Sequence, residues 1–334
     1  MKTILNVGLI GAGRIGQVHA ETLAHGVPGA RLAGIADLNA QVVEETAARL
    51  EVPRWTTDPL ELINDAGIQA VAIASPNDTH AELIIAAASA GKAIFCEKPI
   101  DQDLARTEEA LAAVAKAAVP LQLGFQRRYD AAHLYTKRAV QEGNLGRLIF
   151  VHSHTRDPEP PPSTMWASAG GIFKDTCVHD FDALRWIVGE EIVEVTAMAS
   201  VGPGTNFTSA GEPDIAVISV RFANGVLGHI DAVRGVQYGY DVRTEIIGEK
   251  ASLMGGFHRD IPVTEFGPEG VRHDHVFWFP QRFGQAYRDE LRAWVENITT
   301  GQAVSPGGED GLRALVLALA AQESVTQGSK AVKV

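Results

Sequence analysis

The sequence is poor in cysteine. Its 334 residues include only two, Cys96 and Cys177, and neither belongs to a CxxC pair. Two such thiols do not make a disulfide framework, and free cysteines usually behave as small buried apolar residues. A reducing compartment, the cytoplasm, is therefore the expected location.

Positive charge is also scarce. Lys and Arg number 29 against 41 Asp and Glu, which gives a net charge of −12. Nucleic acids and anionic membranes are bound by basic surfaces, so neither is expected as a partner. No apolar run is long enough to cross a membrane, and the first residues lack the apolar core of a signal peptide. The composition, 46% hydrophobic and 21% charged, is that of a soluble globular protein, and a small molecule is the expected partner.

The length of the chain allows two domains, and the sequence pattern changes near residue 124. Over residues 1–124, apolar strand-like runs alternate with helix-like segments. This alternation predicts an α/β domain, a doubly wound parallel sheet with helices on both faces. The expected strands are 4–10, 31–36, a short one near Trp55, 70–74, 93–96 and 121–123.

Residues 125–334 have a different pattern and form the expected second domain. Consecutive strand-like runs joined by short turns predict an antiparallel sheet, and Asn224-Gly225 is a hairpin signal. The expected strands are 148–154, 193–200, 215–222, 226–233, 242–247 and 251–254. The expected helices are 178–188, 283–298 and 310–325, and the last two can pack back on the first domain.

A glycine-rich motif opens the first domain. The run GAGRIG fits GxGxxG between an expected strand and an expected helix. The first glycine permits the tight turn, the second lets a pyrophosphate approach the backbone, and the third lets helix and strand pack closely. The helix N-terminus then offers N–H groups to the phosphates. The expected dinucleotide-binding residues are Gly11, Gly13, Arg14, Ile15 and Gly16.

Asp37 ends the second expected strand at the spacing of a ribose-binding acid. Its carboxylate can accept hydrogen bonds from the adenosine ribose and would repel a 2′-phosphate. Leu38 and Asn39 supply no arginine for that phosphate, so NAD is expected rather than NADP. The alternative for the whole pattern is a glycine-rich turn with a capping Asp.

Polar residues also follow the next strong strand. Pro76 stops that strand, and Asn77 or Asp78 could cap the helix that follows. Because ligands bind at the carboxyl edge of such a sheet, Ser75, Asn77 and His80 are expected to contact the nicotinamide half of the cofactor. For Asp78, capping and cofactor contact both stay open.

The most informative run is Glu97-Lys98-Pro99, which ends the buried strand of residues 93–96. Lys and Glu are rarely buried unless they are paired, and this strand end faces the ligand edge of the sheet. Lys98 is therefore a candidate catalytic group that stabilises a developing alkoxide. Glu97 either contacts the cofactor or pairs with a neighbouring charge.

Asp175 and His179 lie four residues apart, which on a helix puts both side chains on one face. A carboxylate beside an imidazole favours the protonated ring and fixes its tautomer. The pair suits removal of a hydroxyl proton during alcohol oxidation, and Asp182 lies on the same side. The alternative is a salt-bridged helix start with Asp175 as its cap.

Two further clusters of polar residues lie near the expected ligand edge or on expected strands. Gln126, Arg127 and Arg128 follow the last parallel strand, where one Arg could orient substrate hydroxyls, the alternative being a solvated crossover. His152 and His154 share a strand face, as do two histidines at 273 and 275, but no third ligand has metal-site spacing. No metal is expected, and His154 is interpreted as a polar group near the substrate.

On these motifs, the chain resembles the Gfo/Idh/MocA oxidoreductases along its whole length, and among them the inositol dehydrogenases. The resemblance implies a Rossmann domain joined to a domain with a large open, mostly antiparallel sheet that forms dimers or tetramers. It implies that Lys98, Asp175 and His179 form a catalytic triad completed across the two domains. Further implied residues are Arg127, His154, Asp182 and Tyr238 or Tyr240 for the substrate, and Gln126 and Tyr287 for the cofactor.

The predicted function is NAD-dependent oxidation of a cyclitol ring hydroxyl, of myo-inositol or scyllo-inositol type, to the ketone. Oxidation of another sugar, such as the aldose glucose, is the first alternative. An NAD-dependent glycosidase on the same fold is the second. The proline-rich loop from Pro158 to Trp166 departs from the pattern expected of the inositol enzymes and borders the predicted site.

Overall fold

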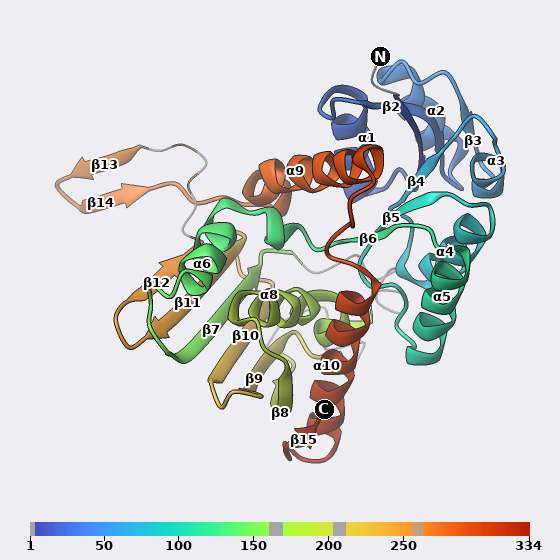
Figure 1. Ribbon diagram of the computed structural model, residues 1–334. Helices are drawn as coiled ribbons and strands as arrows, with labels where there is room; N and C mark the ends of the chain where they lie inside the picture. Colours follow the sequence, from blue (N-terminus) through green and yellow to red (C-terminus); the bar gives the residue numbers. More distant parts are fainter. Residues whose placement is uncertain (1–3, 160–169, 203–211, 257–258, 260, 262) are drawn as a thin grey trace. The chain divides into compact units, whose positions relative to one another are not determined.

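The computed structural model describes residues 4–159, 170–202, 212–256, 259, 261 and 263–334. The chain divides into two compact units, and each contains segments that are far apart in the sequence. The first unit is Met1–Tyr129 with Gln285–Arg313, and the second is Asp130–Gly284 with Ala314–Val334 (Figure 1). Most of the loop from Pro158 to Trp166 lies outside the described residues.

The first unit contains a six-stranded parallel sheet in the order β3-β2-β1-β4-β5-β6. Every strand runs in the same direction, as the alternation of strand and helix predicted. The fully buried central strands explain why their sequences are continuous apolar runs. The strands are β1 (Leu5–Ile10), β2 (Ala30–Ala36), β3 (Trp55–Thr56), β4 (Ala70–Ile73), β5 (Ala93–Glu97) and β6 (Leu121–Gly124).

Helices cover both faces of this sheet (Figure 1). One face packs a core with α1 (Arg14–His25), α2 (Ala40–Arg49) and the later part of α9 (Phe279–Thr300). The remaining helices of the unit are α3 (Pro59–Ile63), α4 (His80–Ser89) and α5 (Leu104–Ala117). Side chains of Asn39, Asp58 and Asp103 accept hydrogen bonds from the first N–H groups of α2, α3 and α5, which sets where these helices begin.

The second unit contains a seven-stranded sheet in the order β12-β11-β7-β10-β9-β8-β15. All neighbours are antiparallel except β7 and β10, so the sheet is mostly antiparallel as predicted. Asn224-Gly225 forms the predicted hairpin turn between β9 and β10, with Gly225 at a φ of 88°. The strands are β7 (Leu148–Asp157), β8 (Ile192–Ser200), β9 (Ile215–Phe222), β10 (Leu227–Arg234), β11 (Asp241–Gly248), β12 (Ser252–Gly255) and β15 (Val332–Lys333).

The two faces of this sheet differ. One face is covered by α6 (Ala131–Gln141), α8 (Val178–Val188) and the later part of α10 (Gly308–Thr326), and it carries the apolar core of the unit. The other face carries half-buried polar side chains such as His152 and Asp231. A separate two-stranded ribbon, β13 (Thr264–Gly267) and β14 (Gly270–His273), was not expected from the sequence.

Both cysteines are buried, as expected. Among the described residues, no helix is long and apolar enough to span a membrane.

Candidate active site

The glycine-rich loop after β1 has the geometry that the motif predicts. Gly11 has a φ of 99°, and a Cβ there would lie 2.4 Å from the carbonyl oxygen of Ala74. A Cβ on Gly16 would lie 2.2 Å from the carbonyl oxygen of Gly11. A Cβ on Gly13 would meet nothing within 4 Å, so this position faces open space. The first and third glycines are thus required by close packing, and the second leaves the backbone accessible to a ligand.

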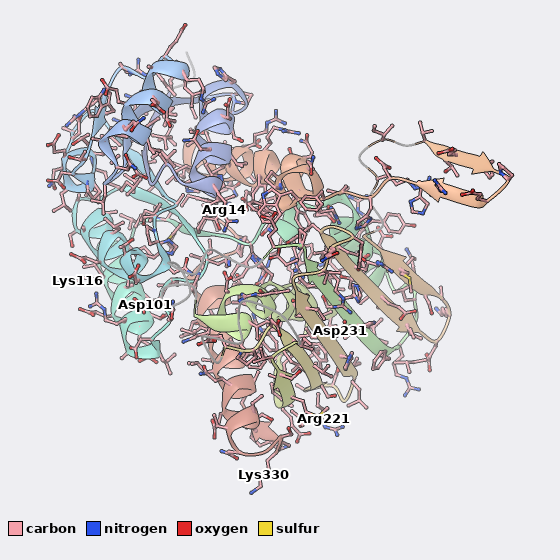
Figure 2. All side chains as sticks on the ribbon, turned by 180° about the vertical axis from the view of Figure 1, so that it is seen from behind. Arg14, Asp101, Lys116, Arg221, Asp231 and Lys330 are labelled. Carbon is pink, nitrogen blue, oxygen red and sulfur yellow. The ribbon has the colours of Figure 1, made fainter. Side chains whose placement is uncertain are left out.

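Asp37 lies directly after β2 and is joined to this loop. Its Oδ2 accepts a hydrogen bond of 2.7 Å from the N–H of Ala12, and its Oδ1 accepts one of 2.8 Å from the N–H of Asn39. These two bonds fix the carboxylate, and each oxygen keeps a lone pair for a further donor such as a ribose hydroxyl. Arg14 begins α1 beside the loop and is exposed (Figure 2). The loop and the acid together can hold a dinucleotide.

His80 is fully buried, and both its ring nitrogens point at carbonyl oxygens. Nδ1 lies 2.7 Å from the oxygen of Pro99 and Nε2 lies 2.9 Å from that of Ser75. Burial lowers the pKa of His80, while the two carbonyls act in the opposite direction. His80 therefore ties the loop after β4 to the turn after β5, and its contact with the nicotinamide half of the cofactor stays a prediction.

The segment between β4 and α4 differs from the expected cap. Asn77–Thr79 forms a 3-10 turn, η1, and α4 follows Thr79 without a side-chain capping bond. Neither Asn77 nor Asp78 is therefore the cap of α4. The Ser75 hydroxyl lies 2.6 Å from that of Thr79, and Asn77 is half-buried at this edge of the sheet.

Glu97 is the last residue of β5, and Lys98 follows it as a half-buried side chain. Glu97 pairs with a residue that the sequence did not point to: its Oε1 lies 2.7 Å from Nε2 of His19 on α1. A Cβ on Gly124, the end of β6, would lie 2.9 Å from the Glu97 carboxyl group. The acid is thus packed inside the first unit, at the end of the strand that positions Lys98.

Three polar residues that follow β6 are all buried. Gln126 donates to the Tyr287 hydroxyl at 3.2 Å, and both side chains are buried in the first unit. Arg127 is only 1% exposed, so it does not belong to a solvated crossover. Arg128 is buried and forms an ion pair of 2.7 Å with Asp310, so it is not part of a solvated crossover either.

Asp175 and His179 lie at the junction of a π-helix, η4 (Ile172–Cys177), with α8. Gly171 precedes η4 with a φ of 74° and makes the sharp entry possible. Arg234, at the end of β10, forms an ion pair of 2.8 Å with Asp175. This buried arginine also donates to the Thr176 hydroxyl, at 2.8 Å from Nη2 and 3.0 Å from Nε. Asp175 is thus held by an arginine instead of capping the helix.

Two further acids on α8 are fully buried. Asp180 accepts hydrogen bonds from Ser153 at 2.5 Å and Thr155 at 2.8 Å, both on β7. These bonds fasten α8 to the sheet at the residue that follows His179. Asp182 is 0% exposed on the same helix.

His154 does not lie with His179. Because side chains alternate along a strand, Ser153 and Thr155 face α8 whereas His154 points to the other face of the sheet. There its Nδ1 lies 3.3 Å from Asp231 and its Nε2 lies 3.5 Å from Asp241. His154 is thus held by two acids on the face of the sheet away from α8, and its place near the substrate stays a prediction.

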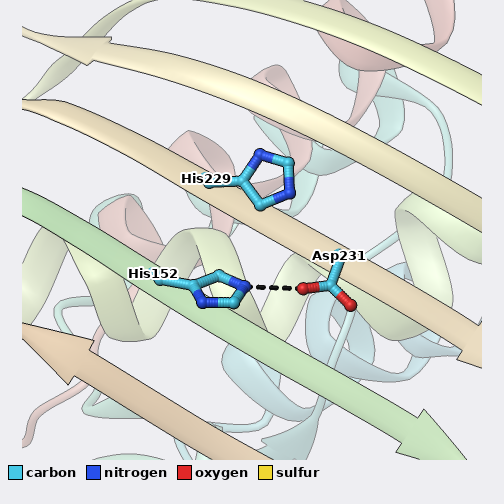
Figure 3. A group of neighbouring side chains, drawn as sticks. All are labelled: His152, His229 and Asp231. Atoms are coloured by element: carbon cyan, nitrogen blue, oxygen red, sulfur yellow. Dashed lines mark hydrogen bonds and ion pairs between the residues drawn. The ribbon is translucent and has the colours of Figure 1, made fainter. Parts of the chain in front are cut away.

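The same polar face carries His152, His229 and Asp231, whose possible ligand atoms lie within 4.8 Å of one another (Figure 3). His152 Nε2 lies 2.6 Å from Asp231 Oδ2. The other oxygen, Asp231 Oδ1, lies 3.3 Å from His154 and forms an ion pair with Arg156. Burial alone would raise the pKa of Asp231, but these neighbours hold it well below its usual range. Both oxygens are engaged, so the group is an ion-pair network in this structure.

The two candidate tyrosines differ. Tyr238 is half exposed, and its hydroxyl donates to Asp241 at 2.9 Å. Tyr240 is buried, with its ring packed against Phe279 and Phe283 at centroid distances of 6.4 and 6.1 Å. Tyr238 is thus the more accessible of the pair.

The six-stranded parallel sheet, its glycine-rich loop and the acid after β2 are typical of the dinucleotide-binding domain of an oxidoreductase. Comparison with known proteins makes this specific. The chain belongs to the Gfo/Idh/MocA oxidoreductase family: its NAD-binding Rossmann fold model matches residues 5–125, and its C-terminal alpha/beta domain model matches residues 137–334. The resemblance inferred from the motifs is confirmed.

The similar proteins include several inositol dehydrogenases. Myo-inositol 2-dehydrogenase of Thermotoga maritima is 39% identical, with 97% of each chain covered. The NAD(+)-dependent scyllo-inositol 2-dehydrogenase of Bacillus subtilis is 34% identical, over 98% of this chain and 96% of that one. Among solved structures, scyllo-inositol dehydrogenase from Lactobacillus casei, with bound NAD(H) and scyllo-inositol, has a TM-score of 0.93 at 31% identity and covers 99% of both chains.

Proposed function

We propose that this chain oxidises a ring hydroxyl of an inositol to the ketone, using NAD as the hydride acceptor. The observation that carries the proposal is the retention of the cofactor loop, Lys98 and the Asp175/His179 pair in a chain that matches inositol dehydrogenases along nearly its full length. The described residues fit a dinucleotide, because Gly13 faces open space and Asp37 is fixed beside the loop.

The proposed cofactor site lies in the first unit. Gly11, Gly13 and Gly16 shape the loop that receives the pyrophosphate, and Asp37 accepts from the ribose hydroxyls. NAD supplies the hydride acceptor when it is bound. Further residues proposed to line the site are Arg14, Ile15, Ser75, Asn77, Gln126 and Tyr287. Glu97 is proposed to support the site from behind, because its carboxyl group contacts His19 and packs against Gly124.

The proposed chemistry uses one residue of the first unit and two of the second. His179 takes the hydroxyl proton, and Asp175 holds the imidazole in the required tautomer. Lys98 stabilises the negative charge that develops on the oxygen as the proton leaves. The residues proposed to orient the other hydroxyls of the ring are Arg127, His154, Asp182 and Tyr238 or Tyr240. The joint placement of Lys98 with Asp175 and His179 remains a prediction.

We also propose that residues 1–124 form the cofactor domain and residues 125–334 the substrate-binding and oligomerisation domain, with Gln285–Arg313 of the latter packed back on the first unit. Several relatives are inositol dehydrogenases, and this supports a small polyol as the partner. A homo-oligomer, dimer or tetramer, and a cytoplasmic location remain predictions. Light scattering on the purified protein measures the oligomeric state directly.

The assay follows NADH formation with myo-inositol, scyllo-inositol and glucose, each with NAD and with NADP. The proposal predicts the highest kcat/KM for an inositol with NAD. A clear preference for glucose would show that the substrate is an aldose and not a cyclitol. A protein that cleaves glycosides without releasing NADH from free polyols would be the glycosidase instead.

The role of Lys98 is tested by Lys98→Ala with Lys116→Ala as a matched control on the exposed last turn of α5 (Figure 2). Removing a group that stabilises developing charge should lower kcat about 10²–10³-fold. The NAD dissociation constant should change little, and Lys116→Ala should match the wild type. Near-normal turnover by Lys98→Ala would refute the assignment.

A further inference from the structure

A buried ionisable cluster in the first unit takes no part in the proposed chemistry. It consists of His19 on α1, Glu97 at the end of β5 and Glu290 on α9. His19 and Glu290 are 0% exposed and Glu97 is 8% exposed. One ring nitrogen and one oxygen from each carboxyl group lie within 4.8 Å of one another. Buried ionisable groups are costly unless their charges are paired or neutralised by protons.

His19 accounts for one proton of this cluster. Its Nε2 lies 2.7 Å from Oε1 of Glu97, and its Nδ1 has no hydrogen-bond partner among the described residues. The ring packs in T-shaped geometry with Phe95 and Tyr287, at centroid distances of 5.2 and 5.9 Å. A neutral imidazole carries one N–H, so the geometry fits a neutral ring that donates from Nε2 to Glu97 and leaves Nδ1 bare.

Glu290 has no such donor. Neither of its carboxyl oxygens has a hydrogen-bond partner among the described residues. The titratable groups that face it are His19, Glu97 and Tyr129 of η2 (Gln126–Tyr129). The Tyr129 hydroxyl donates to the Ser305 carbonyl, and the His19 N–H goes to Glu97. An ionised Glu290 would therefore be a buried charge next to a second carboxylate, which is strongly unfavourable.

We propose that Glu290 is a carboxylic acid that shares its proton with Glu97, while His19 donates to Glu97 from the other side. The cluster then carries a single negative charge, on Glu97, next to Lys98 in the chain. Burial raises the pKa of Glu290, and the neighbouring Glu97 raises it further, which agrees with this protonation state. Glu290 is thus a positioning residue for the end of β5.

A divalent metal could in principle take the place of the proton. It would need two ionised carboxylates and a bare Nε2 on His19. A histidine that binds a metal almost always donates its other ring N–H to an acceptor, and Nδ1 of His19 has none among the described residues. The shared proton therefore fits the cluster better.

The first test is the pH dependence of thermal stability in Glu290→Gln, with Glu296→Gln as the control at an exposed position of the same helix. The pKa of Glu290 is higher in the folded chain than in the unfolded chain. The wild type should therefore lose stability as the pH rises from the unfolded value towards the folded value. Glutamine mimics the neutral acid and lacks this loss. The Tm of Glu290→Gln relative to the wild type should rise by about 2 °C or more per pH unit between pH 5 and 8.

The second test is infrared spectroscopy of the wild-type protein, which does not depend on the folding of a variant. At pH 7 the C=O stretch of a protonated carboxylic acid should be present, and Glu296→Gln should retain it. Where Glu290→Gln folds, it should lack the band. Absence of the band in the wild type, or a Tm difference independent of pH, would overturn the proposal. So would a stoichiometric divalent metal whose removal by a chelator lowers the Tm.

Discussion

At the scale of single residues, we predict that Asp37 sets the preference for NAD over NADP. Its two oxygens are held by the N–H groups of Ala12 and Asn39, so the carboxylate is fixed beside the glycine-rich loop. We expect Asp37→Ala to raise the KM for NAD about tenfold or more, because a hydrogen bond to a charged group contributes about 1.5–3 kcal/mol. The KM for NADP should fall, since the repulsion of its phosphate is removed.

The control for this variant is Glu44→Ala, an exposed acid on α2 close in sequence to Asp37. Steady-state kinetics with both cofactors measures the effect. An unchanged ratio of NAD to NADP efficiency in Asp37→Ala would contradict the role given to this carboxylate.

Single residues also show where prediction from the sequence ends. The glycines, Asp37 and Lys98 could be found because their positions relative to strand ends are fixed by the chain itself. Arg234 was missed, because in the sequence it simply ends an apolar strand, and its partner Asp175 is 59 residues away. His19 was missed for the same reason, since its partner Glu97 is 78 residues away.

At the scale of elements, β10 and η4 are joined by Arg234. Its guanidinium holds both Asp175 and Thr176, which fixes the turn that precedes His179. We expect Arg234→Ala to lower kcat about tenfold or more while the KM for NAD stays near the wild-type value. The reason is that Asp175 loses a charged partner worth about 1.5–3 kcal/mol, and each 1.36 kcal/mol on the barrier is tenfold in rate.

Arg221→Ala on β9 is the matched control, because that arginine is exposed and pairs only loosely, at 3.4 Å, with Glu194. Circular dichroism checks that each variant is folded. Arg234→Lys should recover part of the turnover by restoring the charge. If Arg234→Ala turns over as fast as the wild type, the ion pair between Arg234 and Asp175 does not contribute to catalysis.

The elements themselves were largely predictable, and the exceptions have physical causes. Buried parallel strands read as continuous apolar runs, and the hairpin at Asn224-Gly225 is encoded in two residues. The face to which a strand turns each side chain is not encoded so locally. Whether His154 or its neighbours face α8 depends on Asp180, which binds Ser153 and Thr155 from another element.

At the scale of the whole molecule, both units contain segments distant in sequence. Gln285–Arg313 belongs with the first unit, and Ala314–Val334 with the second. Local patterns predicted that the last two helices can pack back on the first domain. They could not give the residue at which each helix passes from one unit to the other, because packing against distant strands decides it.

The central claim is that the protein moves a hydride from a ring carbon of an inositol to NAD. The most direct measurement uses myo-inositol and scyllo-inositol with deuterium on the ring carbons, followed by mass spectrometry of the nicotinamide product. Hydride transfer from the ring carbon should leave one deuterium in each NADH formed and should be slower than with the unlabelled substrate. NADH without deuterium, or no NADH from either inositol at any pH at which the protein is folded, would contradict it.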